Sequence, residues 1–253
     1  RDFGKLLKMK KTIIIIPSRM SATRLKNKPL LEINNLPIIC HVVKKAKETG
    51  IGNVIVATED KEIVTAVEKN DGEAVLTGNH KTGTDRIFEA FKKLKIVDID
   101  YVVNLQGDEP MIDPKDIINL NNLMIKTNSD IGTLASEIKE SSMLSNKNIV
   151  KVITKKKLEN NNFVEAINFS RQNLPNQNFN IYHHIGIYAY KATVLKKFVN
   201  FNQTKNEIEN RLEQLRALEN NIPIMVALAK SSPIGIDTKE DYIAIKKIME
   251  YKS

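Results

Sequence analysis

The sequence is poor in several residue types and patterns, and each scarcity excludes a class of protein. One cysteine, Cys40, among 253 residues rules out an internal disulfide and a cysteine-rich zinc site. This usage is typical of a cytoplasmic protein, and the apolar neighbours of Cys40 favour a buried structural thiol. No apolar run approaches the roughly 20 residues that span a bilayer. Residues 1–10 lack the pattern of a secretory signal, so we expect a short N-terminal extension there and no membrane partner.

Aromatic residues are also scarce, at 6%, and they do not interleave with the basic residues. The net charge is +9, but the lysines are spread along the chain and form only short clusters. A nucleic-acid-binding surface needs a basic patch or stripe. We therefore expect no nucleic-acid partner, because an anionic small substrate needs only a few local cations.

The composition that remains, 42% hydrophobic and 27% charged residues, is ordinary for a globular protein. The length fits one domain over residues 1–253. In the first half, strand and helix patterns alternate, which predicts a mostly parallel mixed sheet with helices on both faces, an α/β fold. The expected strands are 12–16 (stopped by Pro17), 53–57, 73–76 and 101–105, and the expected helices are 38–48, 61–69, 84–94 and 114–125.

The second half is less regular. Strand patterns occupy residues 149–154, 164–169, 184–190 and 224–229. An amphipathic pattern predicts a helix at 206–218, and a closing helix is expected at 239–249. The asparagine-rich stretch 173–180 reads as a polar loop.

Ligands of open α/β sheets bind beyond the carboxyl ends of the strands. The segment after the first expected strand carries three cations, Arg19, Arg24 and Lys28. Such a loop can wrap a triphosphate, although a solvated basic loop would look the same. The spacing of a P-loop is absent.

Two aspartates stand where a metal ligand would be expected. Asp108 follows the strand at 101–105 and suits Mg²⁺ held against phosphate oxygens, although Gly107 and Pro110 also favour a plain turn. Asp237 precedes the closing helix, where either it or Thr238 could serve as a helix cap.

Two other segments carry polar groups at predicted element ends. Residues 82–86 open a helix whose hydroxyl and N–H groups suit a base, an anion or an ordinary cap, with Thr84 or Asp85 near the helix start. In the strand at 184–190, His184 and Tyr188 share a face. His183 points to the opposite face, and no third ligand has suitable spacing, so zinc is not expected.

Seven stretches in this order resemble the 3-deoxy-manno-octulosonate cytidylyltransferase family, over about residues 12–248. The resemblance implies a nucleotide-diphosphosugar-transferase-like α/β fold and a second-half subregion that contributes to a homodimer. It also implies transfer of CMP from CTP to the anomeric hydroxyl of 3-deoxy-manno-octulosonate (Kdo) for lipopolysaccharide synthesis, with release of pyrophosphate. The stretches are residues 16–30, 55–58, 82–86, 103–110, 169–171, 184–190 and 212–216.

The same resemblance implies roles for individual residues. Arg19, Lys28 and Asp108 would be catalytic, and Asp108 and Asp237 would hold Mg²⁺. The CTP-binding residues would be Pro17, Arg19, Arg24, Lys28, Thr82, Gly83 and Thr84. The residues around the sugar acid would be Arg86, Gln106, His184, Tyr188, Glu213 and Gln214.

The chain departs from the family pattern in the basic loop, where Lys26 and Asn27 replace the usual proline and glycine. Such changes leave the acceptor open between Kdo, an amino-substituted Kdo and a sialic acid. A nucleotide-binding module without turnover is the alternative from another class. The retention of both Asp108 and Asp237 argues against that module.

Overall fold

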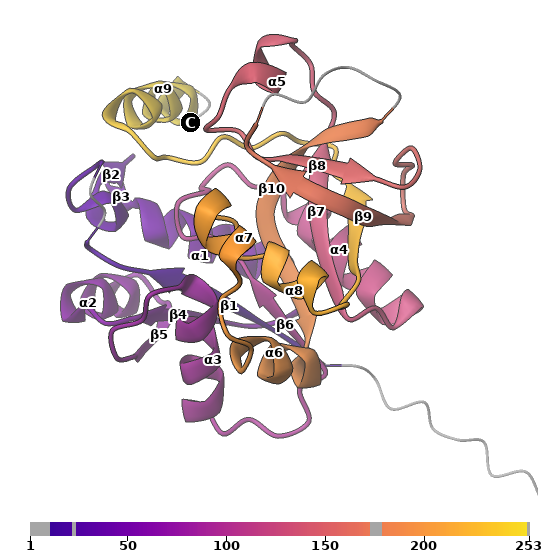
Figure 1. Ribbon diagram of the computed structural model, residues 1–253. Helices are drawn as coiled ribbons and strands as arrows, with labels where there is room; N and C mark the ends of the chain where they lie inside the picture. The colour runs from indigo at the N-terminus through magenta and orange to yellow at the C-terminus, as the bar shows by residue number, and fades with distance from the viewer. Residues whose placement is uncertain (1–10, 22–23, 173–178, 252–253) are drawn as a thin grey trace, which may run out of the picture.

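A computed structural model describes residues 11–21, 24–172 and 179–251 (Figure 1). In these residues a mixed sheet has the strand order β5-β4-β1-β6-β10-β7-β11-β9-β8. The pairs β5–β4, β4–β1, β1–β6 and β7–β11 are parallel, and the other pairs are antiparallel. The strands are β1 (Thr12–Ser18), β4 (Gly52–Thr58), β5 (Glu73–Leu76), β6 (Tyr101–Asn104), β7 (Ile131–Ser136), β8 (Lys151–Thr154), β9 (Phe163–Ser170), β10 (Asn180–Lys191) and β11 (Ile224–Leu228).

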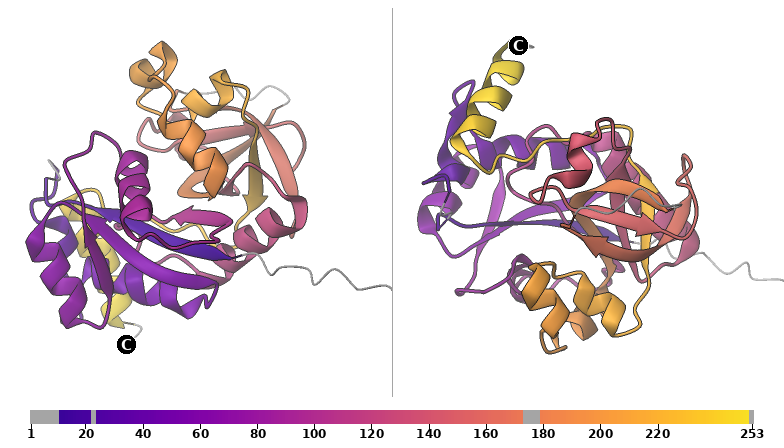
Figure 2. Two further views of the ribbon diagram at one scale, coloured as in Figure 1. Left: turned by 90° about the horizontal axis from the view of Figure 1, so that it is seen from below. Right: turned by 45° about the horizontal axis from the view of Figure 1, so that its top comes forward.

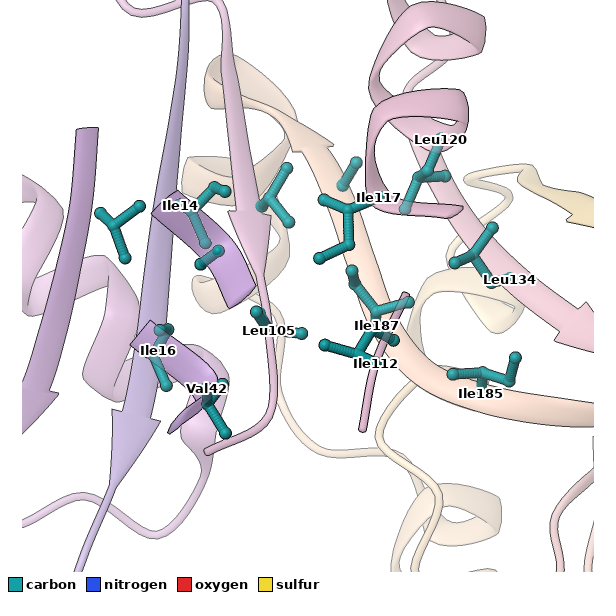
Figure 3. Packing of buried hydrophobic residues seen from close by; sticks show 14 of the residues in the cluster. Ile14, Ile16, Val42, Leu105, Ile112, Ile117, Leu120, Leu134, Ile185 and Ile187 are labelled. Carbon is teal, nitrogen blue, oxygen red and sulfur yellow. The ribbon is translucent and has the colours of Figure 1, made fainter. Parts of the chain in front are cut away.

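Helices cover both faces of this sheet, as expected (Figure 2). Alternation along β1 sends Ile14 and Ile16 to one face and Ile13 and Ile15 to the other. The first face packs against α1 (Ile38–Glu48), α2 (Lys61–Lys69) and α4 (Pro114–Thr127), and Figure 3 shows part of this cluster. The second face packs against α3 (Gly83–Lys93), α6 (Ala192–Val199) and α8 (Leu215–Glu219).

Strand β1 is longer than predicted, because it continues through Pro17 to Ser18. The N–H of Leu105 donates to the Ile15 carbonyl, so Ile15 and Pro17 present their backbone groups to the β6 side. The register between β1 and β6 ends at Ile15, whereas β4 pairs with β1 up to Ser18. Pro17 therefore lies beyond the part of β1 that pairs with β6, so its missing N–H removes no hydrogen bond between the two strands. The prediction that Pro17 stops the strand was wrong for this reason.

The second half departs further from the predictions. The helix expected at 206–218 is two short helices, α7 (Lys205–Asn210) and α8, separated by residues 211–214, the first of which, Arg211, adopts the left-handed conformation (φ 53°). A capping box at Thr204 starts α7, and Ile208, one of the apolar residues of the amphipathic pattern, is 58% exposed. Strand β10 begins at Asn180, the last residue of the expected polar loop; Phe179 is exposed, and residues 173–178 lie outside the described residues.

The last helix, α9 (Lys239–Tyr251), lies beside a small hairpin of β2 (Glu32–Ile33) and β3 (Leu36–Pro37) (Figure 1). A separate apolar cluster joins them, built from Ile33, Ile38, Ile236 and Ile245. The remaining short elements are the 3-10 helix η1 (Lys28–Leu30) and α5 (Ser142–Ser145). Throughout the described chain, every helix is too short or too polar to cross a bilayer.

Candidate active site

A polar cavity of about 340 Å³ opens at the carboxyl ends of β1 and β6. Its walls come from the loop after β1, the start of α3, the segment after β6 and the segment before α9, so four separate predictions converge on one place. The predicted site residues that line it are Pro17, Arg19, Arg24, Lys28, Thr82, Gly83, Arg86, Gln106, Asp108 and Asp237. The other lining residues are Ser18, Ser21, Pro29, His80, Lys81 and Gly107.

The two aspartates converge on one lysine. Lys28 Nζ lies 2.6 Å from Asp108 Oδ2 and 3.4 Å from Asp237 Oδ1. The N–H of Ile236 donates to the Asp108 carbonyl at 2.9 Å, which fixes the backbone of the two segments together. Thr238 caps α9 by accepting from the Asp241 N–H at 3.1 Å, so the Asp237 carboxylate is free to face Lys28.

This arrangement fits a divalent cation. A positive group already sits between the two carboxylates, and carboxylate oxygens are the ligands that Mg²⁺ prefers. No group of three or more histidine, cysteine, aspartate or glutamate side chains gathers within the described ranges. A pair of carboxylates leaves the other coordination positions to phosphate oxygens and water, as is usual for Mg²⁺.

The basic loop is shaped for an anion. Arg19 and Arg24 are exposed, and Arg24 Nη1 lies 3.8 Å from Asp237 Oδ2. The N–H of Met20 donates to Asp60 at 2.7 Å, which anchors the start of the loop. Asn27 adopts the left-handed conformation (φ 55°), which glycine adopts readily and asparagine tolerates. Asn27 therefore suits the backbone conformation that precedes Lys28, which contacts both aspartates.

The start of α3 forms the opposite wall. Thr82, rather than Thr84 or Asp85, is the N-cap, and its hydroxyl accepts from the Asp85 N–H at 3.1 Å. Gly83 lies against Pro17. A Cβ added at Gly83 would be 3.4 Å from the proline ring, so the two segments are in contact. Thr84 is buried and does not line the cavity.

Arg86 also lines the cavity, but most of its donors serve the protein. Its guanidinium is buried, donates to the Thr77 hydroxyl at 2.8 Å and to the Gly78 carbonyl at 3.3 Å, and lies 3.3 Å from Glu59. The contact with Glu59 is made by Nη2 and is an ion pair without hydrogen-bond geometry among the described residues. Arg86 thus braces the loop ahead of α3.

The remaining predicted residues form a second group beside the cavity, not in its lining. The rings of His184 and Tyr188 lie 5.4 Å apart, which confirms that they share a face of β10. His184 Nε2 lies 2.9 Å from the Thr133 hydroxyl, and burial lowers the pKa of His184 to about 3, so the imidazole is neutral. His183 contacts Ser232 instead, on the other face, as the alternation predicts.

Glu213 and Gln214 belong to the same group. Burial raises the pKa of Glu213 to about 7, although hydrogen bonding with Thr84 and the charge of Arg216 oppose the shift. Arg216 donates to Glu207 at 2.9 and 2.5 Å, and its Nη2 also lies 3.8 Å from Glu213 Oε1 in an ion pair. Glu213 Oε1 accepts no hydrogen bond among the described residues. Gln214 is buried beside it.

Gln106 connects the two groups. It lines the cavity, and a Cβ on Gly186 of β10 would lie 3.5 Å from Gln106 Cγ. Strand β10 also pairs with β6, with Tyr188 opposite Asn104, to which the Gln106 amide donates at 3.4 Å. The cavity and the second group are therefore neighbours.

Two residues at the site received no role from the sequence. Burial and the charges of Arg24 and Arg211 lower the pKa of Arg171, whereas the charge of Asp237 raises it, so Arg171 lies near the charges of the cavity. The stretch 169–171 was a sequence signal for it. His80 lines the cavity and hydrogen-bonds Glu89. No pattern in the sequence pointed to His80.

Comparisons with known proteins agree with this geometry. Residues 13–229 match the family described as Cytidylyltransferase, so the class of the protein is cytidylyltransferase. A relative from Bartonella tribocorum, a 3-deoxy-manno-octulosonate cytidylyltransferase, is 41% identical over 94% of this chain and 98% of its own length. A protein of the same name from Afipia carboxidovorans is 42% identical over 94% of this chain and 96% of its own length. The chain belongs to the 3-deoxy-manno-octulosonate cytidylyltransferase family.

Solved structures give the same result. A CMP:2-keto-3-deoxy-manno-octonic acid synthetase complexed with CTP superimposes with a TM-score of 0.87 and 32% identity, over 96% of this chain and 100% of that chain. A UDP-glucose pyrophosphorylase complexed with UDP-glucose has a TM-score of 0.73 at 17% identity, over 97% of this chain and 100% of that chain. The second match confirms the fold that the resemblance implied.

Proposed function

We propose that this chain transfers CMP from CTP to the anomeric hydroxyl of Kdo, giving CMP-Kdo and pyrophosphate for lipopolysaccharide synthesis. The names of its relatives support the reaction. The observation that carries it is the convergence of Lys28 with Asp108 and Asp237 at a cavity lined by Arg19 and Arg24. We also propose that a single domain over residues 1–253 acts as a cytoplasmic homodimer.

The cations of the basic loop would bind the triphosphate. Arg19 and Arg24 are exposed at the mouth of the cavity, where guanidinium groups can form bidentate hydrogen bonds with phosphate oxygens. Lys28 would exchange its contacts with the aspartates for phosphate oxygens when the nucleotide arrives. Pro17, Thr82 and Gly83 would border the nucleoside, and Thr84 would act from behind the wall.

Asp108 and Asp237 are the residues that would hold Mg²⁺. When bound there, the ion would supply charge neutralisation at the α-phosphate and a lower pKa for the attacking hydroxyl. The protein's own part is to hold the two carboxylates on the side of the cavity that Lys28 also reaches. A fixed site of this kind acts by positioning and electrostatics.

The second group would bind the sugar acid. A neutral His184 and a protonated Tyr188, whose pKa burial raises, offer hydrogen bonds to hydroxyl groups without adding charge. Glu213 Oε1, which accepts no hydrogen bond within the described part of the chain, could accept one from the sugar, and Gln106 lies between the two groups. Arg86, from the lining of the cavity, and the buried Gln214 would complete the sugar-acid site.

Pyrophosphate release by the purified protein tests the proposal. CTP with Kdo should give turnover, and UTP or ATP should give little. Preference for an amino-substituted Kdo or a sialic acid would change the acceptor and keep the reaction class. Tight CTP binding without pyrophosphate release on any sugar acid would refute the proposal and support a nucleotide-binding module.

A further inference from the structure

Lys151, in β8, is an unusual residue for a protein interior. Its side chain is fully buried, at 0% exposure. Its ammonium donates to two backbone carbonyls, that of Asn146 at 3.1 Å and that of Arg171 at 2.9 Å. Among the described residues it has no ion pair with a carboxylate. A buried charge without an opposite charge is costly, so an apolar residue of similar length would be the cheaper choice for packing alone.

The two acceptors belong to separate segments that lie outside the strands. Asn146 precedes β8, and Arg171 follows the end of β9 at Ser170. The guanidinium of Arg171 closes a second link, because Nη1 donates to the carbonyls of Asn148 at 3.3 Å and Lys147 at 3.5 Å. The segment 146–148 and Arg171 are thus joined twice, once through the Lys151 ammonium and once through the guanidinium.

The position of Arg171 matters for the site. Phe169, two residues before Arg171, packs its ring edge against His184 of the second group, with 5.0 Å between the ring centroids. The strand register places Lys151 opposite both His183 and Ser170, so the Lys151–Arg171 link lies next to that group. The charges of Arg24, Asp237 and Arg211 also act on the Arg171 guanidinium. The charge of Arg171 also contributes to the lowered pKa of His184 in the second group. Arg171 therefore stands on the side of the cavity where the second group lies, as a cation that an acidic substrate would meet.

We propose that Lys151 is a positioning residue for substrate binding. By holding the Arg171 carbonyl and the 146–148 segment in one place, its ammonium sets where the Arg171 guanidinium stands relative to the acidic sugar. This inference rests on the proposed function, because it takes a sugar acid as the bound anion. This role explains why a lysine, and not an apolar residue, occupies this buried position of β8.

The test is a set of folded variants with full kinetics. Lys151→Met keeps the length of the side chain and removes its donors. We expect the KM for Kdo to rise ~10–100-fold, as for a displaced binding group, with the KM for CTP changed less than about threefold. Thr154→Val is the matched control, because Thr154 is a buried residue of the same strand whose hydroxyl donates to the Lys156 carbonyl at 2.7 Å. It should leave both KM values unchanged.

A double-variant cycle separates positioning from general support. If Lys151 acts through Arg171, the variant with Lys151→Met and Arg171→Ala should have the same KM for Kdo as Arg171→Ala alone. Multiplicative effects would overturn the proposal. So would a lowered melting temperature of Lys151→Met with an unchanged KM for Kdo.

Lys151→Gln guards against a variant that does not fold, since it keeps N–H donors on a shorter side chain. It should show a smaller rise in the KM for Kdo than Lys151→Met. If neither variant folds, Lys151 belongs to folding and not to substrate positioning, which overturns the proposal. The parent protein is assayed first, because absence of turnover with CTP and Kdo would refute the proposed function itself, whereas normal parent turnover isolates the question of Lys151.

Discussion

The ammonium of Lys28 offsets the repulsion between the carboxylates of Asp108 and Asp237, and replacing Lys28 by methionine would remove this compensation. Its ammonium lies 2.6 Å from Asp108 and 3.4 Å from Asp237, and its side chain is only 14% exposed. The two carboxylate oxygens that it contacts are therefore within about 6 Å of each other, where like charges repel by about 1–3 kcal/mol at intermediate dielectric. The Asp237 side chain is 55% exposed, so water screens the pair and the lower end of the range, about 1 kcal/mol, applies.

Two opposite effects should follow from Lys28→Met. Without divalent cations the variant should be less stable than the parent, yet Mg²⁺ should stabilise it more, because no ammonium competes for the carboxylates. Use of CTP should fall, because a hydrogen bond from a charged donor contributes about 1.5–3 kcal/mol, which corresponds to roughly 10- to 200-fold in kcat/KM.

Thermal denaturation in EDTA and in Mg²⁺, with pyrophosphate release at varied CTP, measures both effects. Lys26→Met is the control, since Lys26 is an exposed residue of the same loop. It should match the parent in stability and kinetics. Unchanged turnover at low CTP in Lys28→Met, or equal stabilisation of parent and variant by Mg²⁺, would refute the electrostatic reasoning.

Three further outcomes are expected. Under the proposal that Asp108 and Asp237 hold one cation, Asp108→Asn and Asp237→Asn should each reduce turnover at least ~100-fold, and the double variant should be little worse than the weaker single variant. EDTA should abolish parent activity and Mg²⁺ restore it, whereas fully multiplicative losses in folded variants would contradict a shared ion. His184→Ala should raise the KM for Kdo and leave CTP binding nearly intact, as equilibrium binding of CTP would show. Glu213, with its pKa raised to about 7, binds a proton more tightly in the folded chain than unfolded, so its unfavourable contribution appears as pH rises from about 4.5 to 7. Glu213→Gln should consequently gain stability over the parent at pH 8, on the order of 1–3 kcal/mol, and little at pH 4.5; equal gains at both pH values would exclude this titration.

The first half of the fold could be predicted from the sequence because its signals are local. Helices α1 and α2 and strand β5 have the predicted bounds, since short polar connections separate well-formed periodic patterns. Asp113 caps α4, accepting from the Lys115 N–H at 2.9 Å, and a capping residue directly before a periodic pattern is also a local signal.

Long-range packing limited the prediction elsewhere. Strand β7 was missed, because Gly132 and Thr133 interrupt its apolar pattern. Gly132 is needed there, since a Cβ would lie 2.6 Å from Met124 of α4 and 2.9 Å from the ring of Phe163. The apolar spacing predicted one continuous helix at 206–218, but the left-handed conformation of Arg211 ends α7 within it. In both cases a contact or a backbone conformation that the pattern does not encode decided the outcome.

The site divides in the same way. The position of polar segments after strands could be inferred from the sequence, and the resemblance supplied the pairing of Asp108 with Asp237. The contact of both with Lys28 needed the folded chain, because it depends on the hydrogen bond from Ile236 to Asp108. The buried link from Lys151 to Arg171 joins two main-chain carbonyls, which leave no trace in side-chain patterns.

The way Asp237 reaches the cavity has a consequence for local stability. Its neighbour Ile236 belongs to the small cluster that docks α9 on the β2–β3 hairpin, apart from the two large clusters on the faces of the sheet. Proteins open regionally, and regions with few buried apolar contacts open at lower free energy than the core. Fluctuations that release α9 would separate the two aspartates in molecules whose sheet remains intact. Under the proposed role of Asp237, mild denaturant should therefore reduce activity before it melts the sheet.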